Sequence, residues 1–123
     1  METAPKKVCL ANLAESSEQE VFDWVTYNLI KQGEQSVKGN DCLYRKDNLR
    51  CAAGWLLDDE DYSETLEGKP WDDLVLEHQV PNTHADLIYA LQYIHDGEEV
   101  VVWPEEFKRL AEEHNLTYNS WEK

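Results

Sequence analysis

The chain has 123 residues, 41% of them hydrophobic and 11% aromatic, which is enough apolar surface for one folded core and too little for two domains. Asp and Glu number 26 against 11 Lys and Arg, which gives a formal net charge of -15 at pH 7. Direct binding to nucleic acid and adsorption to an anionic membrane both need a basic surface, so this balance argues against both.

The first clear helix signal follows an irregular N-terminal stretch. Residues 1–16 show no periodicity and predict a loose arm. Ser17 and Glu20 have the spacing of a capping box. Apolar residues then recur at helical spacing up to Gly33, a residue suited to the left-handed end of a helix. This pattern predicts a helix over 17–32.

A polar loop over 34–40 precedes two short runs that predict a β-hairpin. The runs are 42–45 and 49–53, separated by an Asp-Asn turn. In this hairpin Cys42 and Cys51 should lie on opposite strands and face each other.

The small apolar segment 52–57 should enter the core, and Gly54 indicates a close backbone approach there. Four consecutive acids, Asp58–Asp61, end that segment. Pro70 is typical of the first turn of a helix and predicts a short one over 70–78.

Two further helices are expected in the last third of the chain. Thr83 and Asp86 resemble a second capping box and predict a helix over 83–95. The short apolar run 100–102 is β-prone. A proline then opens a last helix over 104–114, with Asn115 as its cap and Leu116 packing back.

Together these elements predict one α+β domain, with about four helices packed around a small hairpin. The domain should span 17–116, between the loose arm 1–16, anchored at Val8 and Leu10, and a C-terminal tail over 117–123.

Charge is unevenly distributed along the chain. Residues 1–57 carry 7 Lys and Arg against 8 Asp and Glu, whereas residues 58–123 carry 4 against 18. One interpretation is that the acids keep a small helical protein soluble. The other is that rows of carboxylates imitate a phosphate backbone and bind a basic partner. The residues expected to contact such a partner are Asp58, Asp59, Glu60, Asp61, Glu64, Glu67, Asp72 and Asp73.

The two hairpin cysteines leave three interpretations open. They are small buried apolar residues, which is the usual fate of a free cysteine and the preferred interpretation, or they form a cross-strand disulfide. The third is zinc binding together with two histidines, although the spacing is unlike that of common zinc sites. The candidate histidines are His78, His84, His95 and His114.

Little else in the sequence points to an enzyme. His95 and Asp96 are adjacent, and neighbours on a helix are expected to point in different directions. The four acids at 58–61 lack the spacing of a calcium loop. No phosphate-binding glycine loop or nucleophile elbow is present, so no catalytic residue, metal or cofactor is expected.

Four of the five tryptophans, Trp24, Trp55, Trp71 and Trp103, sit at core-like positions and should pack inside. Trp121, in the polar tail, either folds back on the domain, which is the favoured interpretation, or is an exposed anchor for a partner.

Residues 20 to 116 resemble a group of small, largely uncharacterised proteins encoded by bacteriophages and prophages. The most specific part is the hairpin pattern Cys-x-Tyr-Arg to Cys-Ala-x-Gly at 42–45 and 51–54. Other members often have a further Cys where this chain has Trp55, which argues against a metal site at the hairpin. The remaining matching positions are Gln32-Gly33, Ser36, Tyr62, Glu67-Gly68, Leu91-Gln92 and His95-Asp96.

This resemblance implies a phage accessory protein made in a bacterial cytoplasm, and it supplies no established catalytic or ligand-binding residues to carry over. We therefore expect a non-enzymatic acidic protein that binds and inhibits a host or phage nucleic-acid-handling protein by mimicking nucleic acid. One alternative is a small enzyme or metal protein centred on Cys42, Cys51, His84 and His95. The other is a self-associating virion or assembly component.

The expected location is the cytoplasm. No apolar run approaches the roughly 20 residues needed to cross a bilayer, and the first residues lack the apolar segment of a secretory signal. The odd count of 3 cysteines also fits a reducing compartment.

Overall fold

In the computed structural model, which describes residues 3–123, helix α1 (Glu18–Gln32) begins at the predicted capping box. The Glu20 amide donates to Ser17 Oγ at 3.1 Å, and the Ser17 amide donates to Glu20 Oε1 at 2.9 Å. The helix ends at Gly33, whose φ of 69° is left-handed. The prediction of a helix over 17–32 is confirmed.

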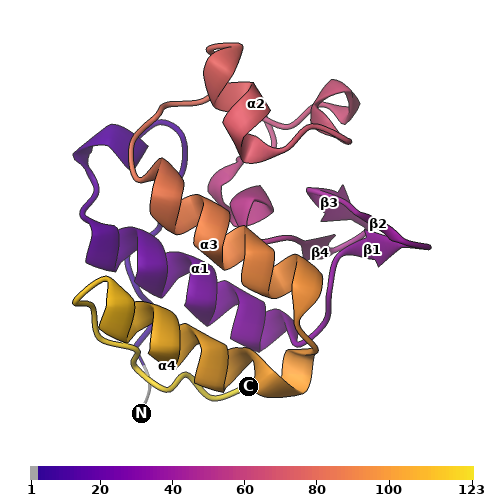
Figure 1. The fold of residues 1–123 in the computed structure, drawn as a ribbon. Helices are drawn as coiled ribbons and strands as arrows, with labels where there is room; N and C mark the ends of the chain where they lie inside the picture. Colours follow the sequence, from indigo (N-terminus) through magenta and orange to yellow (C-terminus); the bar gives the residue numbers. More distant parts are fainter. Residues whose placement is uncertain (1–2) are drawn as a thin grey trace.

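Helices α1, α3 (Ala85–Gly97) and α4 (Trp103–Glu113) pack against one another, and the short α2 (Trp71–Leu76) packs on α3 (Figure 1). Buried side chains from all four helices and from residues 8–13 and 51–57 form a single hydrophobic cluster. With two small antiparallel hairpins beside the helices, the α+β single-domain prediction is confirmed.

The predicted start of the third helix is wrong by two residues. Thr83 and Asp86 form no capping box, because the residue before the helix is His84, which has a φ of 57° and makes no side-chain cap. The run Val100–Val102 is also not extended. It forms a 3-10 turn that leads directly into α4, and Val101 is 78% exposed.

The single predicted hairpin is two hairpins. Strands β1 (Val37–Lys38) and β2 (Asp41–Cys42) pair first, and β3 (Arg45–Lys46) pairs with β4 (Leu49–Arg50). Cys42 is therefore opposite Val37, and the prediction that it faces Cys51 across one hairpin is wrong.

The reason is the Glu67 carboxylate, which accepts the backbone amides of Tyr44 at 2.8 Å and Arg45 at 3.2 Å. The chain turns there instead of continuing one ladder. Gly39, with a φ of 62°, makes the unexpected first turn.

Segments near both ends of the chain pack on the domain, while residues 1–2 of the predicted arm lie outside the described residues. Val8 and Leu13 are completely buried, and the Leu10 amide donates to the Leu56 carbonyl at 3.1 Å, so the arm packs on the domain from Val8, the first of its two expected anchors. In the tail, Trp121 Nε1 donates to Thr26 Oγ1 at 3.0 Å. Trp121 therefore folds back on α1, which agrees with the favoured interpretation.

No helix among residues 3–123 is both long enough and apolar enough to span a membrane.

Candidate functional site

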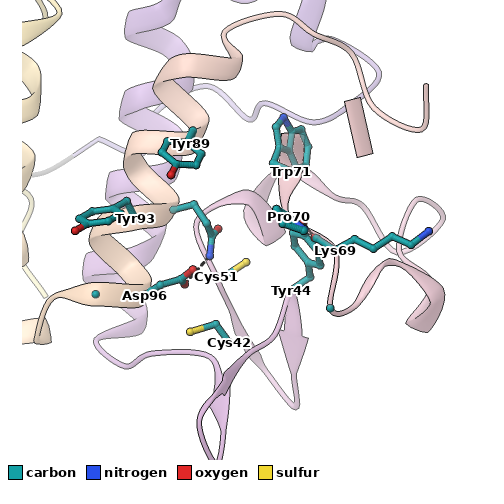
Figure 2. A pocket seen from close by; sticks show the side chains of 12 residues that line it. Cys42, Tyr44, Cys51, Lys69, Pro70, Trp71, Tyr89, Tyr93 and Asp96 are labelled. Carbon is teal, nitrogen blue, oxygen red and sulfur yellow. Dashed lines mark hydrogen bonds between the residues drawn. The ribbon is translucent and has the colours of Figure 1, made fainter. Parts of the chain in front are cut away.

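A cavity of about 430 Å³ lies between α3 and the segment Gly68–Trp71 (Figure 2). Its walls are aromatic: Tyr89 and Tyr93 stand on one side, and Tyr44 and Trp71 on the other. Its polar lining includes Cys42, Cys51, Lys69, Gln92 and Asp96.

Helix α3 supplies four of the lining side chains because they share one face. Tyr89, Gln92, Tyr93 and Asp96 follow the spacing of three and four residues that aligns side chains along a helix. The opposite stripe of α3 is buried in the core. Tyr89 and Tyr93 are 54% and 64% exposed, so they form an open edge of the cavity.

The opposite wall is held in place by hydrogen bonds to Tyr44 and to its neighbours. The Tyr44 hydroxyl donates to the carbonyl oxygen of Lys69. Glu67 accepts the Tyr44 amide and also the Tyr62 hydroxyl, at 2.7 Å. Behind this wall, Gly54 approaches the Tyr44 carbonyl so closely that a Cβ would collide with it. The close approach predicted at Gly54 is confirmed.

Asp96 is the centre of the polar lining. Its Oδ1 accepts from Gln92 Nε2 and from His95 Nδ1, both at 2.7 Å. Gln92 is oriented in turn, because its Oε1 accepts the Ala53 amide at 2.9 Å. The expectation that His95 and Asp96 point apart is wrong: the end of α3 brings the two side chains together.

The Ser36 amide determines which nitrogen of His95 carries the proton. It donates to Nε2 at 3.0 Å, so Nε2 must keep its lone pair and Nδ1 must carry the hydrogen that Asp96 accepts. His95 is completely buried, and both of its ring nitrogens are used. It is a structural residue that orients Asp96.

The two cavity cysteines are free thiols. Burial, followed by the charge of Asp96 and a hydrogen bond to it, raises the pKa of Cys42 to about 11. Burial likewise raises the pKa of Cys51. Nucleophilic and metal-binding cysteines need the thiolate, so both residues are poorly suited to either role at neutral pH.

The donor atoms of Cys42, His95 and Asp96 lie within 4.8 Å of one another, a spacing that could hold a metal ion. The hydrogen bonds argue against this use. A metal on His95 Nδ1 would require a proton on Nε2, which would then face the Ser36 amide hydrogen. His84, the other histidine of the enzyme or metal hypothesis, lies at the opposite end of α3, with Nε2 at 2.6 Å from the Ser16 carbonyl.

The acids predicted to bind a partner are divided by the structure into two groups. Asp58 pairs with Lys7 at 2.8 Å, and Asp59 pairs with Arg45 at 2.8 Å. Asp61 accepts the Asp58 amide. Glu67 accepts the backbone amides of Tyr44 and Arg45. These four acids therefore stabilise turns of the chain itself.

The other four acids have neither an ion pair nor a side-chain hydrogen bond within residues 3–123, and all are exposed. They are Glu60, Glu64, Asp72 and Asp73. The last two lie in the first turn of α2, directly after the cavity residue Trp71.

The cavity itself was missed by sequence reasoning. The available signal was the row Tyr89, Gln92, Tyr93 and Asp96, which places two large aromatic residues on the helix face opposite the predicted apolar stripe. Comparison with family models, with curated proteins and with solved structures finds no match to this chain.

Proposed function

We propose that this chain is a non-enzymatic protein whose acidic surface binds a basic partner. The partner is a nucleic-acid-handling protein of a bacterial host or a phage. The observation that carries the proposal is the set of four exposed acids without internal partners among the described residues, two of which lie in the first turn of α2. The proposal also includes that the protein is encoded by a phage and made in a bacterial cytoplasm. The basis for this part is the resemblance of residues 42–45 and 51–54 to phage proteins.

The electrostatics support a basic partner. Residues 58–123 carry 18 acids against 4 Lys and Arg, and one of those lysines, Lys69, is already paired with Glu77 at 2.9 Å. Such a field accelerates encounter with a cationic surface, and the acceleration falls as salt is added. Carboxylates presented in this way can occupy a cleft that otherwise binds phosphates, which is how nucleic-acid mimicry would inhibit the partner.

The two alternatives have less support. The enzyme or metal hypothesis needs Cys42, Cys51, His84 and His95 at one site, and His84 is bound to the Ser16 carbonyl at the far end of α3. The self-association hypothesis needs the basic hairpin of one copy to contact the acidic half of another, and two of the basic residues, Arg45 and Arg50, already lie 2.8 and 3.7 Å from Asp59 of the same chain.

The experiment is affinity capture from bacterial lysate at low and high salt, followed by measurement of the affinity for the captured protein. The test variant is E60K/E64K/D72K, and the matched control is E105K/E112K/E113K. Both change the charge equally, and each alters one residue in the first turn of a helix. We expect the test variant to lose roughly tenfold or more in affinity and the control to lose much less. Equal losses, or salt-independent binding, would refute the proposal.

A further inference from the structure

The cavity beside α3 has features that the acidic surface alone does not explain. It combines four aromatic side chains with one carboxylate, and one of its lining residues, Trp71, directly precedes the exposed acids Asp72 and Asp73 of α2. Binding sites are commonly apolar clefts with a few fixed polar groups, and aromatic pockets are where interface energy concentrates.

Asp96 has no cationic side chain beside it among the described residues. Its only close ionisable neighbour of basic type there is His95, whose Nε2 accepts a hydrogen bond from the Ser36 amide. Lys69 also lines the cavity, but its Nζ is paired with Glu77. The Asp96 side chain is 39% exposed and points into the cavity (Figure 2), so an incoming positive charge can reach it.

The acceptor capacity of Asp96 limits what can bind there. A carboxylate has about four lone-pair positions. Gln92 and His95 both donate to Oδ1. Among the described residues no N–H or O–H group donates to Oδ2, so this oxygen is left for a ligand, and the ligand's remaining donors must face aromatic rings or water.

The rest of the cavity also favours a cation. Burial, and then the nearby charges, which include Glu67, Asp96 and Asp73, raise the pKa of the Tyr44 hydroxyl. The Cys42 thiol is kept protonated for the same reasons. These groups are uncharged and lie in a negative potential, which repels anions and attracts cations.

We propose that this cavity binds the side chain of one arginine from the basic partner, with its guanidinium against Asp96 and its flat face against the tyrosines of α3. This inference rests on the proposed function and names the anchor of that interface.

Arginine fits better than lysine for two reasons. A guanidinium is planar and weakly hydrated, so it stacks on aromatic rings at little cost. A lysine ammonium is compact and strongly hydrated, so moving it from water into an aromatic pocket costs more. Tyr89 and Tyr93, one helical turn apart at the cavity edge, offer the ring faces that a guanidinium uses.

The test compares binding of a hexa-arginine peptide and a hexa-lysine peptide of equal charge, by calorimetry at low salt. The first variant is D96N, and its matched control is D86N, which removes one charge from an exposed residue of the same helix. We expect D96N to weaken hexa-arginine binding roughly tenfold or more, and D86N to change it by less than about twofold.

A second variant tests the cavity without disturbing the hydrogen bonds that Asp96 accepts from Gln92 and His95. Tyr93 is largely exposed, so Y93L should fold normally and should reduce the preference for hexa-arginine over hexa-lysine. N-acetylarginine amide should shift the ring NMR signals of Tyr89 and Tyr93 in the unmodified protein and should fail to do so in D96N.

The outcomes separate this inference from the function on which it rests. If E60K/E64K/D72K abolishes peptide binding while D96N matches D86N, the acidic surface binds the partner and the arginine cavity is refuted. Equal affinity for the two peptides in the unmodified protein also refutes the cavity. If no variant changes binding, both proposals fail.

Discussion

Adding one methyl group at Gly54 should disturb the cavity wall and the second hairpin together. An alanine Cβ at this position would collide with the Tyr44 carbonyl oxygen and lie 3.3 Å from Cβ of Arg50. Neither neighbour can move freely. The Tyr44 amide is held by Glu67, and the Arg50 amide donates to Gln32 at 2.9 Å. G54A must therefore displace a hydrogen-bonded backbone.

The magnitude follows from the cost of overpacking a filled interior, which is about 1–3 kcal/mol. The unfolding entropy of a domain is about 2.1 cal/mol/K per residue, or about 0.26 kcal/mol/K for a chain of this length. The expected fall in Tm is therefore about 4–12 °C. Total stability for this length is about 6–18 kcal/mol, so the variant should still fold.

The assay is thermal unfolding followed by circular dichroism, with G97A as the control. A Cβ at Gly97 has no atom within 4 Å, and Gly97 has no positive φ, so alanine there should be neutral or stabilise the protein by up to about 1 kcal/mol. If G54A unfolds at the same temperature as the unmodified protein, the close approach of Gly54 to Tyr44 is wrong.

Three further predictions concern the first helix, the cavity thiol and the tail. S17A removes the capping box and should lower the free energy of unfolding by about 1 kcal/mol in urea denaturation; an unchanged midpoint would contradict the cap. Because the folded pKa of Cys42 is about 11 against 9.0 for an ordinary thiol, its contribution to stability is complete below pH 9 and is lost as the pH rises toward 11. Alkylation of Cys42 by iodoacetamide at pH 8, read by peptide mass spectrometry, should accordingly be slow in the folded protein and faster in D96N. W121A loses the hydrogen bond to Thr26 and the edge contact with Tyr27, whose ring centroid is 5.2 Å away, and should cost about 2 kcal/mol. W121F keeps a ring at this position and should recover part of that loss; equal stability of all three proteins would show that the tail does not pack.

The first and last helices could be predicted because their signals are local. Ser17 and Glu20 lie at the start of the first helix, and Gly33 lies directly after its end. At the other end, Asn115 takes a φ of 58° and the Leu116 amide donates to the Ala111 carbonyl at 2.7 Å, as that stretch of sequence predicts.

The hairpins and the cavity depend on partners far away in the sequence, which local patterns cannot supply. Glu67 turns the chain at Tyr44 from 23 residues away. The Ser36 amide sets the tautomer of His95 across 59 residues, and so decides how Asp96 is presented. A capping pattern at Thr83 was misleading for the same reason, because His84 is bound to the Ser16 carbonyl, 68 residues earlier.

The attachment of the tail to α1 has a consequence for synthesis of the protein on the ribosome. Gln19 exchanges hydrogen bonds with the backbone of Thr117, Asn119 donates to Asp23, and Trp121 donates to Thr26. These partners are separated by 95 to 98 residues. Translation proceeds from the N-terminus at about 5–20 residues per second. One side of α1 therefore stays uncovered for several seconds, and during that time chaperones can bind the nascent chain.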